Sequence, residues 1–468
     1  MKILLITPPY DFIKEGFGSK SKIRTGQLPN LGLCFIAANL EKHNYLVELL
    51  DAQARNLSAR QTAEEVCKYN PDIVGISITN AHYKNVRELV DRIRTNYNGL
   101  IVVGGPHVTC FPSLILKENP AVDIAVIGEG EITMIEIADA FKNKTLLSKI
   151  KGIAYREKDK IKITESRPTL IRLDDLPNPA WHLLDFNLYC PLPDQYKELP
   201  AISMITSRGC TWKKCTFCFE AGVNANIYRR HSPERVVENI ILLQKNYNLK
   251  EIDFLDDEFF INEKWIEMFS KLIREKNIKI SWSAFGRVDH TTEKMLERAK
   301  ESGCWGVYFG FETGDEELLK VINKGTTLEQ AKKVCKWCHN LGIEIRGSFM
   351  LGLPEETPEK AMKTINFAIE LGLDTAAFRL TYPEYGTKLY DIAKREGKIF
   401  DGWQKMTEVS YLPKGYKDTQ ELKNIQRLAF RKFYFRPGYV LRRISRIRSI
   451  KDIRRNYEGL KFLLGIID

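Results

Sequence analysis

The sequence predicts an α/β protein made of a doubly wound parallel sheet, a partial (β/α)6 barrel and an α-helical basic tail. Three observations carry this prediction. Short apolar runs alternate with helical stretches through the first 145 residues, the alternation returns with a longer period in the middle of the chain, and the last residues are rich in arginine. Strands that alternate with helices of about ten or more residues are typical of parallel sheets.

Composition and length fit a globular protein with more than one domain. The chain has 468 residues, of which 44% are apolar and 28% charged, and this balance excludes a disordered or fibrous chain. No apolar run approaches the roughly eighteen residues that span a bilayer, and Pro8 and Pro9 interrupt the N-terminal apolar run where a signal peptide would continue. We therefore expect a cytoplasmic protein.

Residues 1–145 form the first predicted domain. Its strand candidates are KILLIT, YLVELLDA, DIVGISI, LIVVGG and DIAVIGEGE, with helical stretches between them. We expect these strands to build a doubly wound parallel sheet, in which ligands lie at the carboxyl ends of the strands. Residues 146–195 are predicted to be a linker with a small hairpin, because prolines interrupt the stretch LDDLPNPAWHLLD.

Residues 196–405 form the second predicted domain, a partial barrel. Its six strand candidates are AISMITS, EIDFLDDEF, KISWSAFGR, WGVYFGFET, IRGSFMLGLP and TAAFRLTYPE. Helical stretches such as PERVVENIILLQKNY follow them, so six βα units succeed one another. In such barrels the side chains that act on ligands lie at the carboxyl ends of the strands, and the polar motifs described below fall there.

The tail, residues 406–468, carries most of the net charge. Thirteen basic and four acidic residues lie between Glu421 and Asp468, a difference of nine out of the formal +11. Arginines interleave with an apolar set that comprises Phe430, Phe433, Phe435, Tyr439, Val440, Leu441, Ile444, Ile447 and Ile450. This pattern indicates an interfacial membrane segment, and a peripheral position at the inner membrane surface would follow. Two further interpretations stay open: a helix that caps the barrel with its isoleucines in the core, which we favour over the membrane segment, and nucleic-acid binding, which we disfavour.

Three of the ten cysteines are crowded into one stretch, SRGCTWKKCTFC, as Cys210, Cys215 and Cys218. In a reducing compartment so dilute a set of cysteines argues against a disulfide framework, so the cluster indicates metal. Three thiolates leave one iron of a [4Fe–4S] cluster open to another group. A zinc site with His231 as a distant fourth ligand, or three unrelated thiols, would explain the same pattern.

The cysteine loop resembles that of the radical S-adenosylmethionine (SAM) enzymes. Their usual spacing is Cys-x3-Cys-x2-Cys, and this chain has Cys-x4-Cys-x2-Cys because TWKK carries one extra residue. The resemblance continues through FLDDEFF, FGRVD, GFETG and GSFMLGLPEET at successive strand ends. It implies that the three cysteines hold a [4Fe–4S] cluster. It further implies that SAM is bound by Phe217, Asp256, Asp257, Glu258, Arg287, Glu312 and Gly352.

Each of these polar residues also has an ordinary structural interpretation. The Asp-Asp pair could be a solvated turn or a helix cap, Arg287 could pair with Asp289, and Glu312 could cap a helix that begins near Asp315. Their order after the cysteine loop favours the cofactor site.

Glycines end two neighbouring strands of the first domain, in IVVGGPHVT and VIGEGE. Taken alone they indicate a nucleotide-type site of weak specificity, because no G-x-G-x-x-G is present. Together with the barrel, however, the domain resembles the Rossmann-like cobalamin-binding domain of class B radical SAM enzymes. The resemblance implies a cobalamin site formed by Ser77, Gly104, Gly105, Pro106, His107, Gly128, Glu129 and Gly130. Because Asp-x-His-x-x-Gly is missing from the sequence, we expect no histidine ligand on cobalt, and His107 could equally be a loop residue.

The resemblance implies a reaction. Reductive cleavage of SAM would give a 5′-deoxyadenosyl radical that removes hydrogen from an unreactive carbon, and methylcobalamin would then deliver a methyl group. The substrate would be a small or lipid-like molecule that contacts Tyr382, Glu384 and Tyr385, and a ferredoxin or flavodoxin would donate the electron. The motifs concern the cofactors, so an oxidative cyclase or ring-rearranging enzyme stays open, as does a non-enzymatic cobalamin- or redox-sensing module.

A second Cys-x-x-C lies inside the helical stretch LEQAKKVCKWCHNLG. Cys335 and Cys338 would share one helix face, and an auxiliary cluster would need more ligands, of which Cys304 is a candidate. Ordinary buried helix cysteines are the favoured interpretation.

Overall fold

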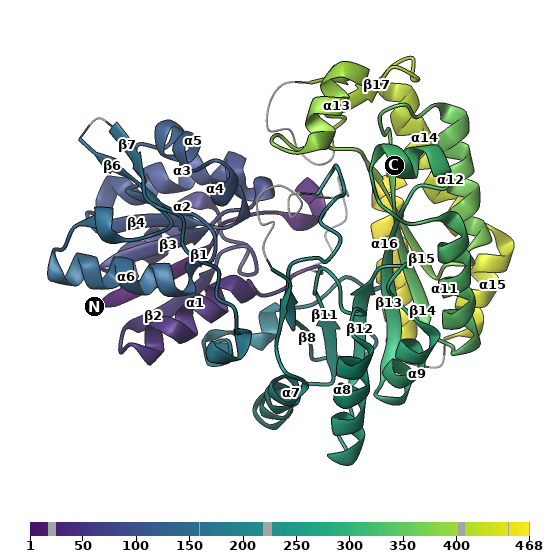
Figure 1. Cartoon of the computed structure of the whole chain (residues 1–468), viewed down its shortest axis with the longest axis horizontal. Coiled ribbons are helices and arrows are strands. Elements are labelled where there is room, and N and C mark those ends of the chain that lie inside the picture. The colour runs from purple at the N-terminus through teal and green to yellow at the C-terminus, as the bar shows by residue number, and fades with distance from the viewer. Residues whose placement is uncertain (17–24, 159, 219–226, 401–407, 448, 468) are drawn as a thin grey trace. The chain divides into compact units, whose positions relative to one another are not determined.

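The computed structural model describes residues 1–16, 25–158, 160–218, 227–400, 408–447 and 449–467, so Arg448 and Asp468 of the predicted basic tail lie outside the described residues. The chain divides into two compact units. Unit 1 comprises Met1–Phe12 and Gln27–Tyr189, and unit 2 comprises Ile13–Gly26 and Cys190–Asp468 (Figure 1).

Unit 1 is built around a seven-stranded sheet in the order β2-β1-β3-β4-β5-β6-β7, of which the first five strands are parallel. The strands are β1 (Lys2–Thr7), β2 (Leu46–Asp51), β3 (Ile73–Ser77), β4 (Leu100–Gly104), β5 (Ile124–Val126), β6 (Ile153–Glu157) and β7 (Lys160–Ile163). The helices are α1 (Leu31–Lys42), α2 (Ala59–Tyr69), α3 (Asn80–Asn96), α4 (Pro106–Cys110), α5 (Pro112–Glu118) and α6 (Gly130–Asn143). The predicted hairpin is β6–β7, and it extends this sheet because β6 pairs antiparallel with β5.

Unit 2 contains a six-stranded parallel sheet in the order β15-β14-β13-β12-β11-β8. Its strands are β8 (Ala201–Met204), β11 (Glu251–Phe254), β12 (Ser281–Gly286), β13 (Cys304–Glu312), β14 (Glu344–Leu351) and β15 (Thr375–Leu380). Its covering helices are α7 (Pro233–Tyr247), α8 (Glu263–Glu275), α9 (Glu293–Glu301), α10 (Glu316–Val321), α11 (Leu328–Asn340), α12 (Pro358–Glu370) and α13 (Lys388–Glu396). Two short antiparallel pairs are β9 (Ser207–Arg208) with β10 (Arg229–Arg230) and β16 (Gly397–Ile399) with β17 (Tyr411–Pro413). The predicted fold class is confirmed.

Capping residues fix where the barrel helices begin, and aromatic packing holds neighbouring barrel strands together. Ser232, Thr327 and Thr357 each accept a backbone hydrogen bond from the first turn of the helix that follows, which satisfies donors that a helix start leaves open. In the interior, the ring of Phe254 packs against Trp282 of the next strand. These contacts fix the strand ends from which the candidate site is built.

In the part of the tail that the structure describes, three helices follow β17, namely α14 (Thr419–Tyr434), α15 (Pro437–Ser445) and α16 (Ile450–Ile467). Leu422 and Phe433 of α14 are buried in unit 2, and Gln426 donates to the backbone oxygen of Phe378 in β15. Within the described ranges, no helix combines the length and the apolar character that crossing a bilayer requires.

Candidate functional site

The cysteine loop begins directly after the first barrel strand and leads from β9 to Cys218. Cys215 is buried, whereas Cys210 and Cys218 are half-buried. Gly209 and Lys213 both have positive φ, at 87° and 52°. The second is unusual for a lysine, and a left-handed residue between Cys210 and Cys215 shortens the path of a four-residue spacer.

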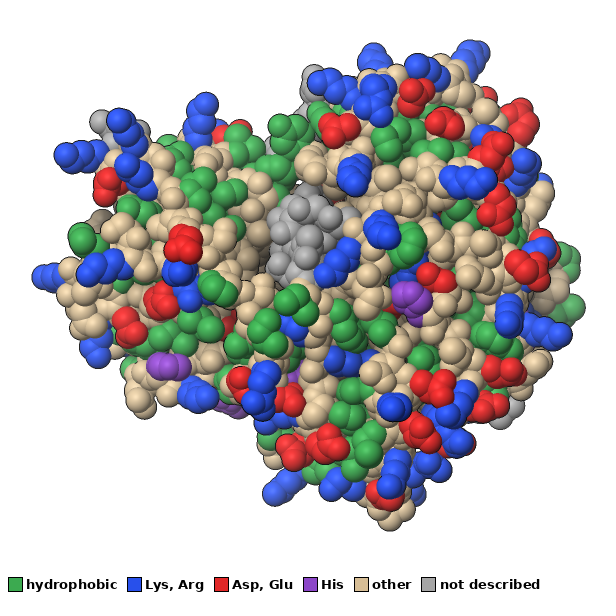
Figure 2. Space-filling view, viewed as in Figure 1, with side chains coloured by type: hydrophobic (Ala, Val, Ile, Leu, Met, Phe, Trp, Pro, Cys, Tyr) green, Lys and Arg blue, Asp and Glu red, His purple; other side chains and the backbone are tan. Residues whose placement is uncertain are grey.

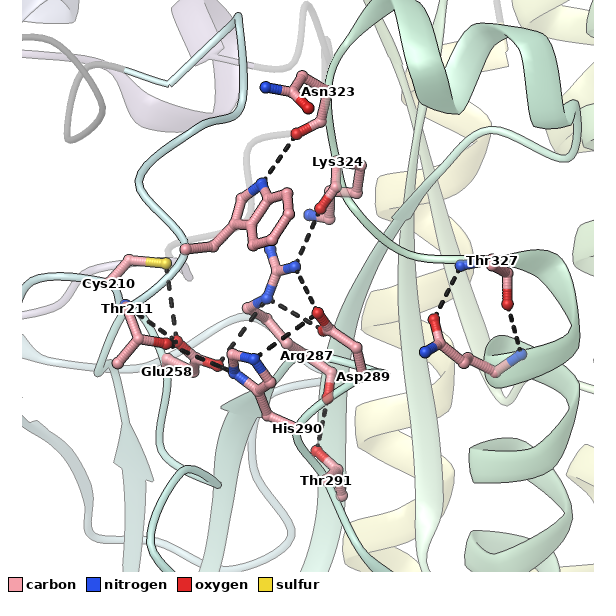
Figure 3. A network of polar contacts seen from close by, with 12 residues as sticks. Cys210, Thr211, Glu258, Arg287, Asp289, His290, Thr291, Asn323, Lys324 and Thr327 are labelled. Carbon is pink, nitrogen blue, oxygen red and sulfur yellow. Dashed lines mark hydrogen bonds and ion pairs between the residues drawn. The ribbon is translucent and has the colours of Figure 1, made fainter.

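One side of the loop is held by Glu258, which lies beyond the end of β11 and is fully buried. One carboxylate oxygen accepts hydrogen bonds from the Thr211 amide at 3.3 Å, the Thr211 hydroxyl at 3.0 Å and the Cys210 thiol at 3.6 Å. The other oxygen accepts from His290 (Figure 3). These contacts tie the first cysteine to the second barrel strand.

The other side of the loop is held by the turn after α10. The Trp212 indole donates to the backbone oxygen of Asn323 at 2.8 Å, and the Asn323 amide donates to the backbone oxygen of Lys214 at 2.9 Å. Gly325 has a φ of 74°, and a Cβ there would overlap the Trp212 ring. The spacer that carries the extra residue is therefore docked against residues 323–325.

We predict that Gly325→Ala loosens the loop and lowers iron loading. The new methyl group would displace Trp212, so backbone amides of residues 210–216 should exchange hydrogen at least about tenfold faster in the cofactor-free protein. Gly342→Ala is the matched control, because Gly342 also has positive φ while its Cβ would meet only Lys300 Nζ at 3.9 Å. Both variants carry a similar backbone strain of about 1 kcal/mol. Equal exchange and equal iron per chain in the two variants would show that the Trp212 contact does not hold the loop.

Two cations lie close to Cys215. Burial raises the pKa of the Cys215 thiol, while the positive charges of Lys324 and Arg287 act in the opposite direction. Lys324 Nζ also pairs with Glu312 Oε1 at 2.7 Å, and both side chains are buried. A carboxylate and an ammonium group thus stand next to the cysteine loop at the end of β13.

Glu312 adopts a positive φ of 65° where β13 shifts register against β14. A non-glycine residue in this region carries a strain of about 1–3 kcal/mol, and such strain persists where the surroundings fix the side chain. Gly310 leaves space for the Glu312 carboxylate, because a Cβ at position 310 would overlap that carboxylate. Glu312 does not cap the next helix, since Asp315 accepts the hydrogen bonds from the first turn of α10.

Arg287, Asp256 and Asp257 lie in three different environments. Arg287 does pair with Asp289, donating to both carboxylate oxygens at 3.1 and 2.8 Å, and it also donates to the Lys324 backbone oxygen (Figure 3). Asp256 is buried and accepts from the backbone amides of Thr206 and Ser207, which turns its carboxylate toward the end of strand β8. Asp257 is exposed.

The remaining predicted SAM residues lie toward β14. Phe217 packs against the apolar cluster that contains Leu319 and Leu353, and its ring lies 5.7 Å from Lys324 Nζ. Gly352 has a φ of 81° directly after β14, and its amide donates to the buried Glu356. The structure therefore brings Glu258, Arg287, Glu312 and Phe217 around the cysteine loop and leaves Asp256 within its own buried network. Their ligand contacts stay predictions.

The three cysteines of the loop are candidate donors for a [4Fe–4S] cluster or for a single zinc ion. Among the described residues, no three His, Cys, Asp or Glu side chains lie close enough together to hold a single metal ion. A zinc site needs such a group, whereas each cysteine of a [4Fe–4S] cluster binds a separate iron. His231, the candidate fourth zinc ligand, is buried, and its backbone oxygen accepts a hydrogen bond from Trp265. Cys335, Cys338 and Cys304 are buried, and burial raises the pKa of all three thiols.

The glycine turns of unit 1 follow adjacent strands β4 and β5. Gly105 has a φ of 106°, and a Cβ there would lie 2.7 Å from the Ile78 backbone oxygen. The Gly128 amide donates to the Thr109 hydroxyl at 3.0 Å, which links the two turns. Gly128 is exposed with a φ of 82°, and a Cβ there would meet no atom within 4 Å. The glycine surface at these strand ends lets a ligand approach the backbone closely, and a corrin contact there stays a prediction.

The other predicted cobalamin residues surround these turns. Ser77 pairs in register with Gly104, Pro106 begins α4, Glu129 precedes α6 and Gly130 begins it. His107 is fully buried, with its ring stacked on Tyr83 at 4.3 Å, and burial lowers its pKa to about 4. We interpret His107 as a support of the glycine turn from inside the unit.

The predicted substrate residues follow β15. Tyr382 and Glu384 are half-buried and Tyr385 is exposed. Burial raises the pKa of Glu384 to about 7. A carboxyl group with this pKa changes charge near neutral pH, and its contact with a substrate stays a prediction.

Sequence reasoning missed Lys324, Trp212 and His290. Lys324 stands in NKG directly after a helix, a stretch that looks like an ordinary helix end. Trp212 belongs to the four-residue spacer between Cys210 and Cys215. The length of this spacer showed that the loop departs from the usual spacing, but it did not indicate that Trp212 contacts residues 323–325. His290 lies three positions after Arg287, and its partner Glu258 is distant in sequence.

Comparisons with known proteins match both parts of the chain. The Radical SAM superfamily model matches residues 204–368, and the B12 binding domain model matches residues 24–138. An "uncharacterized methyltransferase" of Pyrococcus horikoshii is 36% identical, with 98% of each chain covered. The cytidylyl-2-hydroxyethylphosphonate methyltransferase of Streptomyces wedmorensis is 28% identical, with 79% of this chain and 78% of the relative covered. A solved structure with a similar fold is that of TsrM from Kitasatospora setae, a radical S-adenosylmethionine methyltransferase with cobalamin and a [4Fe–4S] cluster bound. Its TM-score is 0.71 at 16% sequence identity, and the comparison covers 100% of this chain and 89% of the other.

Proposed function

The chain belongs to the cobalamin-binding radical SAM enzymes, and from this membership we propose that it methylates an unactivated carbon of a small-molecule or lipid-like substrate. Membership assigns it a [4Fe–4S] cluster, SAM and cobalamin as cofactors. The observation that carries the proposal is the cysteine loop, which contacts Glu258 on one side and residues 323–325 on the other.

The residues around the loop are proposed to hold SAM by charge complementarity. The methionyl group carries an ammonium and a carboxylate, and the buried pair of Glu312 and Lys324 offers a partner for each. Arg287, fixed by Asp289, adds a second cation for the carboxylate or the ribose. Gly104, Gly105 and Gly128 are proposed to support the corrin from the strand ends of unit 1.

In this proposal the chain positions the reactants and keeps water away from them. The chemistry that the bound groups supply is radical initiation by the cluster with SAM, and a transferable methyl group from cobalamin. Burial of Cys215, Glu258 and Lys324 excludes solvent from the cluster end of the barrel. Glu384 and Tyr382 at the β15 end are proposed to orient the substrate.

A ferredoxin or flavodoxin is the proposed electron donor. Lys214, which lies in the spacer beside Cys215, is exposed, and its ammonium group lies 5.0 Å from the Trp212 ring. A positive charge at the surface of the cluster loop would attract an acidic donor protein.

The proposal is tested anaerobically without knowledge of the substrate. The reconstituted protein, supplied with cobalamin, reductant and SAM whose methyl group carries deuterium, should contain about four irons per chain and release 5′-deoxyadenosine. It should also form deuterium-labelled methylcobalamin, measured by mass spectrometry. Release of 5′-deoxyadenosine without labelled cobalamin would favour a cyclase or ring-rearranging enzyme, and neither product would favour a sensing module.

A further inference from the structure

The outward face of α16 is apolar, which is the reverse of what a surface helix normally presents. The exposed positions of this helix are Ile450, Ile453, Arg454, Tyr457, Leu460, Lys461 and Leu464. Ile450 is 85% exposed, Ile453 55% and Tyr457 56%. The apolar members recur every three or four positions, so they form one stripe about 21 Å long. We call Ile450, Ile453, Tyr457, Leu460 and Leu464 the outer stripe.

The opposite face of α16 is fastened to unit 2 by polar contacts. Arg455 donates to the Tyr196 backbone oxygen at 2.9 Å. Arg443 of α15 donates to the Asn456 side chain at 2.8 Å. The outer stripe cannot turn inward without breaking these contacts, so α16 does not cap the barrel core with the tail isoleucines.

The neighbouring helix α15 presents the same kind of surface. Leu441 is 68% exposed and Ile444 is 58% exposed, and Val440 is exposed beside them. Along the edge where α15 lies in Figure 1, hydrophobic and basic side chains stand next to one another (Figure 2). The contact between Arg443 and Asn456 joins the two helices, so their exposed residues belong to one region.

The charges of this region have one sign. The exposed charged side chains of α15, α16 and the residue that follows α15 are Arg446, Arg454 and Lys461, and Arg446 pairs with Asp374 at 2.5 Å and with Glu344 at 3.7 Å. The three acidic residues that the structure describes between 421 and 467 are half-buried. Two of them are already paired, Asp452 with Arg455 and Glu458 with Arg454 at 3.2 Å. The exposed charged groups of the region are basic, so an occupant that is partly apolar and negatively charged complements it.

We propose that α15 and α16 form a docking surface for an anionic lipid bilayer. The outer stripe would lie at the boundary between headgroups and acyl chains, and Arg454 and Lys461 would contact lipid phosphates. A second copy of the chain fits less well, because a symmetric contact would bring like charges together. A nucleic acid fits less well because the outer stripe would face phosphates, and interfaces with DNA are more polar.

The test uses the purified full chain and needs no cofactor, so its failure is separate from failure of the proposed methylation. The protein is sedimented with vesicles of phosphatidylcholine alone or with about one-quarter phosphatidylglycerol. We expect about tenfold tighter binding to the anionic vesicles, weakened by salt. Ile453→Ser with Tyr457→Ser and Leu460→Ser should weaken that binding by about tenfold or more. Arg454→Gln with Lys461→Gln should remove much of the salt dependence.

The matched control replaces three comparably exposed apolar residues of unit 1, Leu46→Ser with Ile163→Ser and Ile171→Ser. This variant should bind vesicles like the wild type. Loss of binding in both triple variants, or none in either, would overturn the proposal. The proposal would also be overturned if the wild type bound no vesicles but formed a dimer that only the outer-stripe variant lost. Binding to duplex DNA without binding to vesicles would overturn it as well.

Discussion

Cys215→Ala is expected to remove the cluster and abolish radical chemistry. Reconstituted wild type should hold about four irons per chain, and the variant less than about one, because two remaining thiolates cannot hold a [4Fe–4S] cluster. Release of 5′-deoxyadenosine should fall by at least about a thousandfold, since SAM cleavage has no electron source without the cluster. Iron analysis, the absorbance near 400 nm and product quantification check the three parts of this expectation.

Cys335→Ala is the matched control for this experiment. Cys335 is buried like Cys215 and lies on α11 rather than on the loop. Its loss should cost only a small cavity, about 1 kcal/mol of stability, and leave iron content and product unchanged. If Cys335→Ala loses iron while Cys215→Ala keeps it, the cluster lies elsewhere. A colourless wild-type protein that holds zinc would contradict the proposed cofactor outright.

The fold and the cysteine loop were predictable because their signals are local. Alternation of strands and helices is visible in short stretches, and the strand candidate IRGSFMLGLP contains all of β14 except Glu344 and extends three residues past its end. The order of motifs along the barrel then placed Arg287 and Glu312 at neighbouring strand ends. Parallel strands in sequential order convert sequence order into spatial order, so the motifs meet at one edge.

The partners of these residues were not predictable, because they depend on contacts between distant parts of the chain. The sequence left open whether Glu312 caps a helix, and its actual partner Lys324 lies across a helix and a turn. Asp256 is joined to Thr206, fifty positions earlier, and to the buried Arg230 at 3.8 Å. Periodicity says which face is buried, but it does not say which charges meet there.

The apolar tail illustrates a different limit. The sequence predicted basic helices with interleaved apolar residues, and three interpretations of these helices stayed open: a membrane segment, a nucleic-acid-binding segment and a cap on the barrel core. Burial separates the core interpretation from the two surface interpretations, because the same isoleucine can serve a core or a surface, and Ile450 and Ile453 are on the surface. A pattern of period 3.6 identifies the two faces of a helix without saying which one faces the protein.

The deepest charge pair of the barrel gives the largest expected effect on stability. Arg346 of β14 is 2% exposed and donates to Asp253 Oδ1 and Ser283 Oγ, each at 3.1 Å. Arg346→Met would leave the Asp253 carboxylate buried with Ser283 as its remaining partner in this set. Removing one partner of a buried pair costs about 3–5 kcal/mol, so we expect unit 2 to lose that much. Urea unfolding of the cofactor-free protein, followed by tryptophan fluorescence, measures it, since Trp305 lies 5.6 Å from the guanidinium.

The pair also predicts a dependence on pH with a definite sign. Burial raises the pKa of Asp253, and Arg346 opposes that rise. Without Arg346 the folded-state pKa rises further above the unfolded value, so the folded variant binds a proton that the unfolded chain releases. The variant should therefore regain stability as the pH falls, and its deficit should be smaller at about pH 5 than at about pH 8. Adding Asp253→Asn removes the unpaired charge and should restore at least about half of the loss at pH 8. A deficit that does not change with pH, or that Asp253→Asn deepens, would mean that lost packing and not the stranded carboxylate destabilises the barrel.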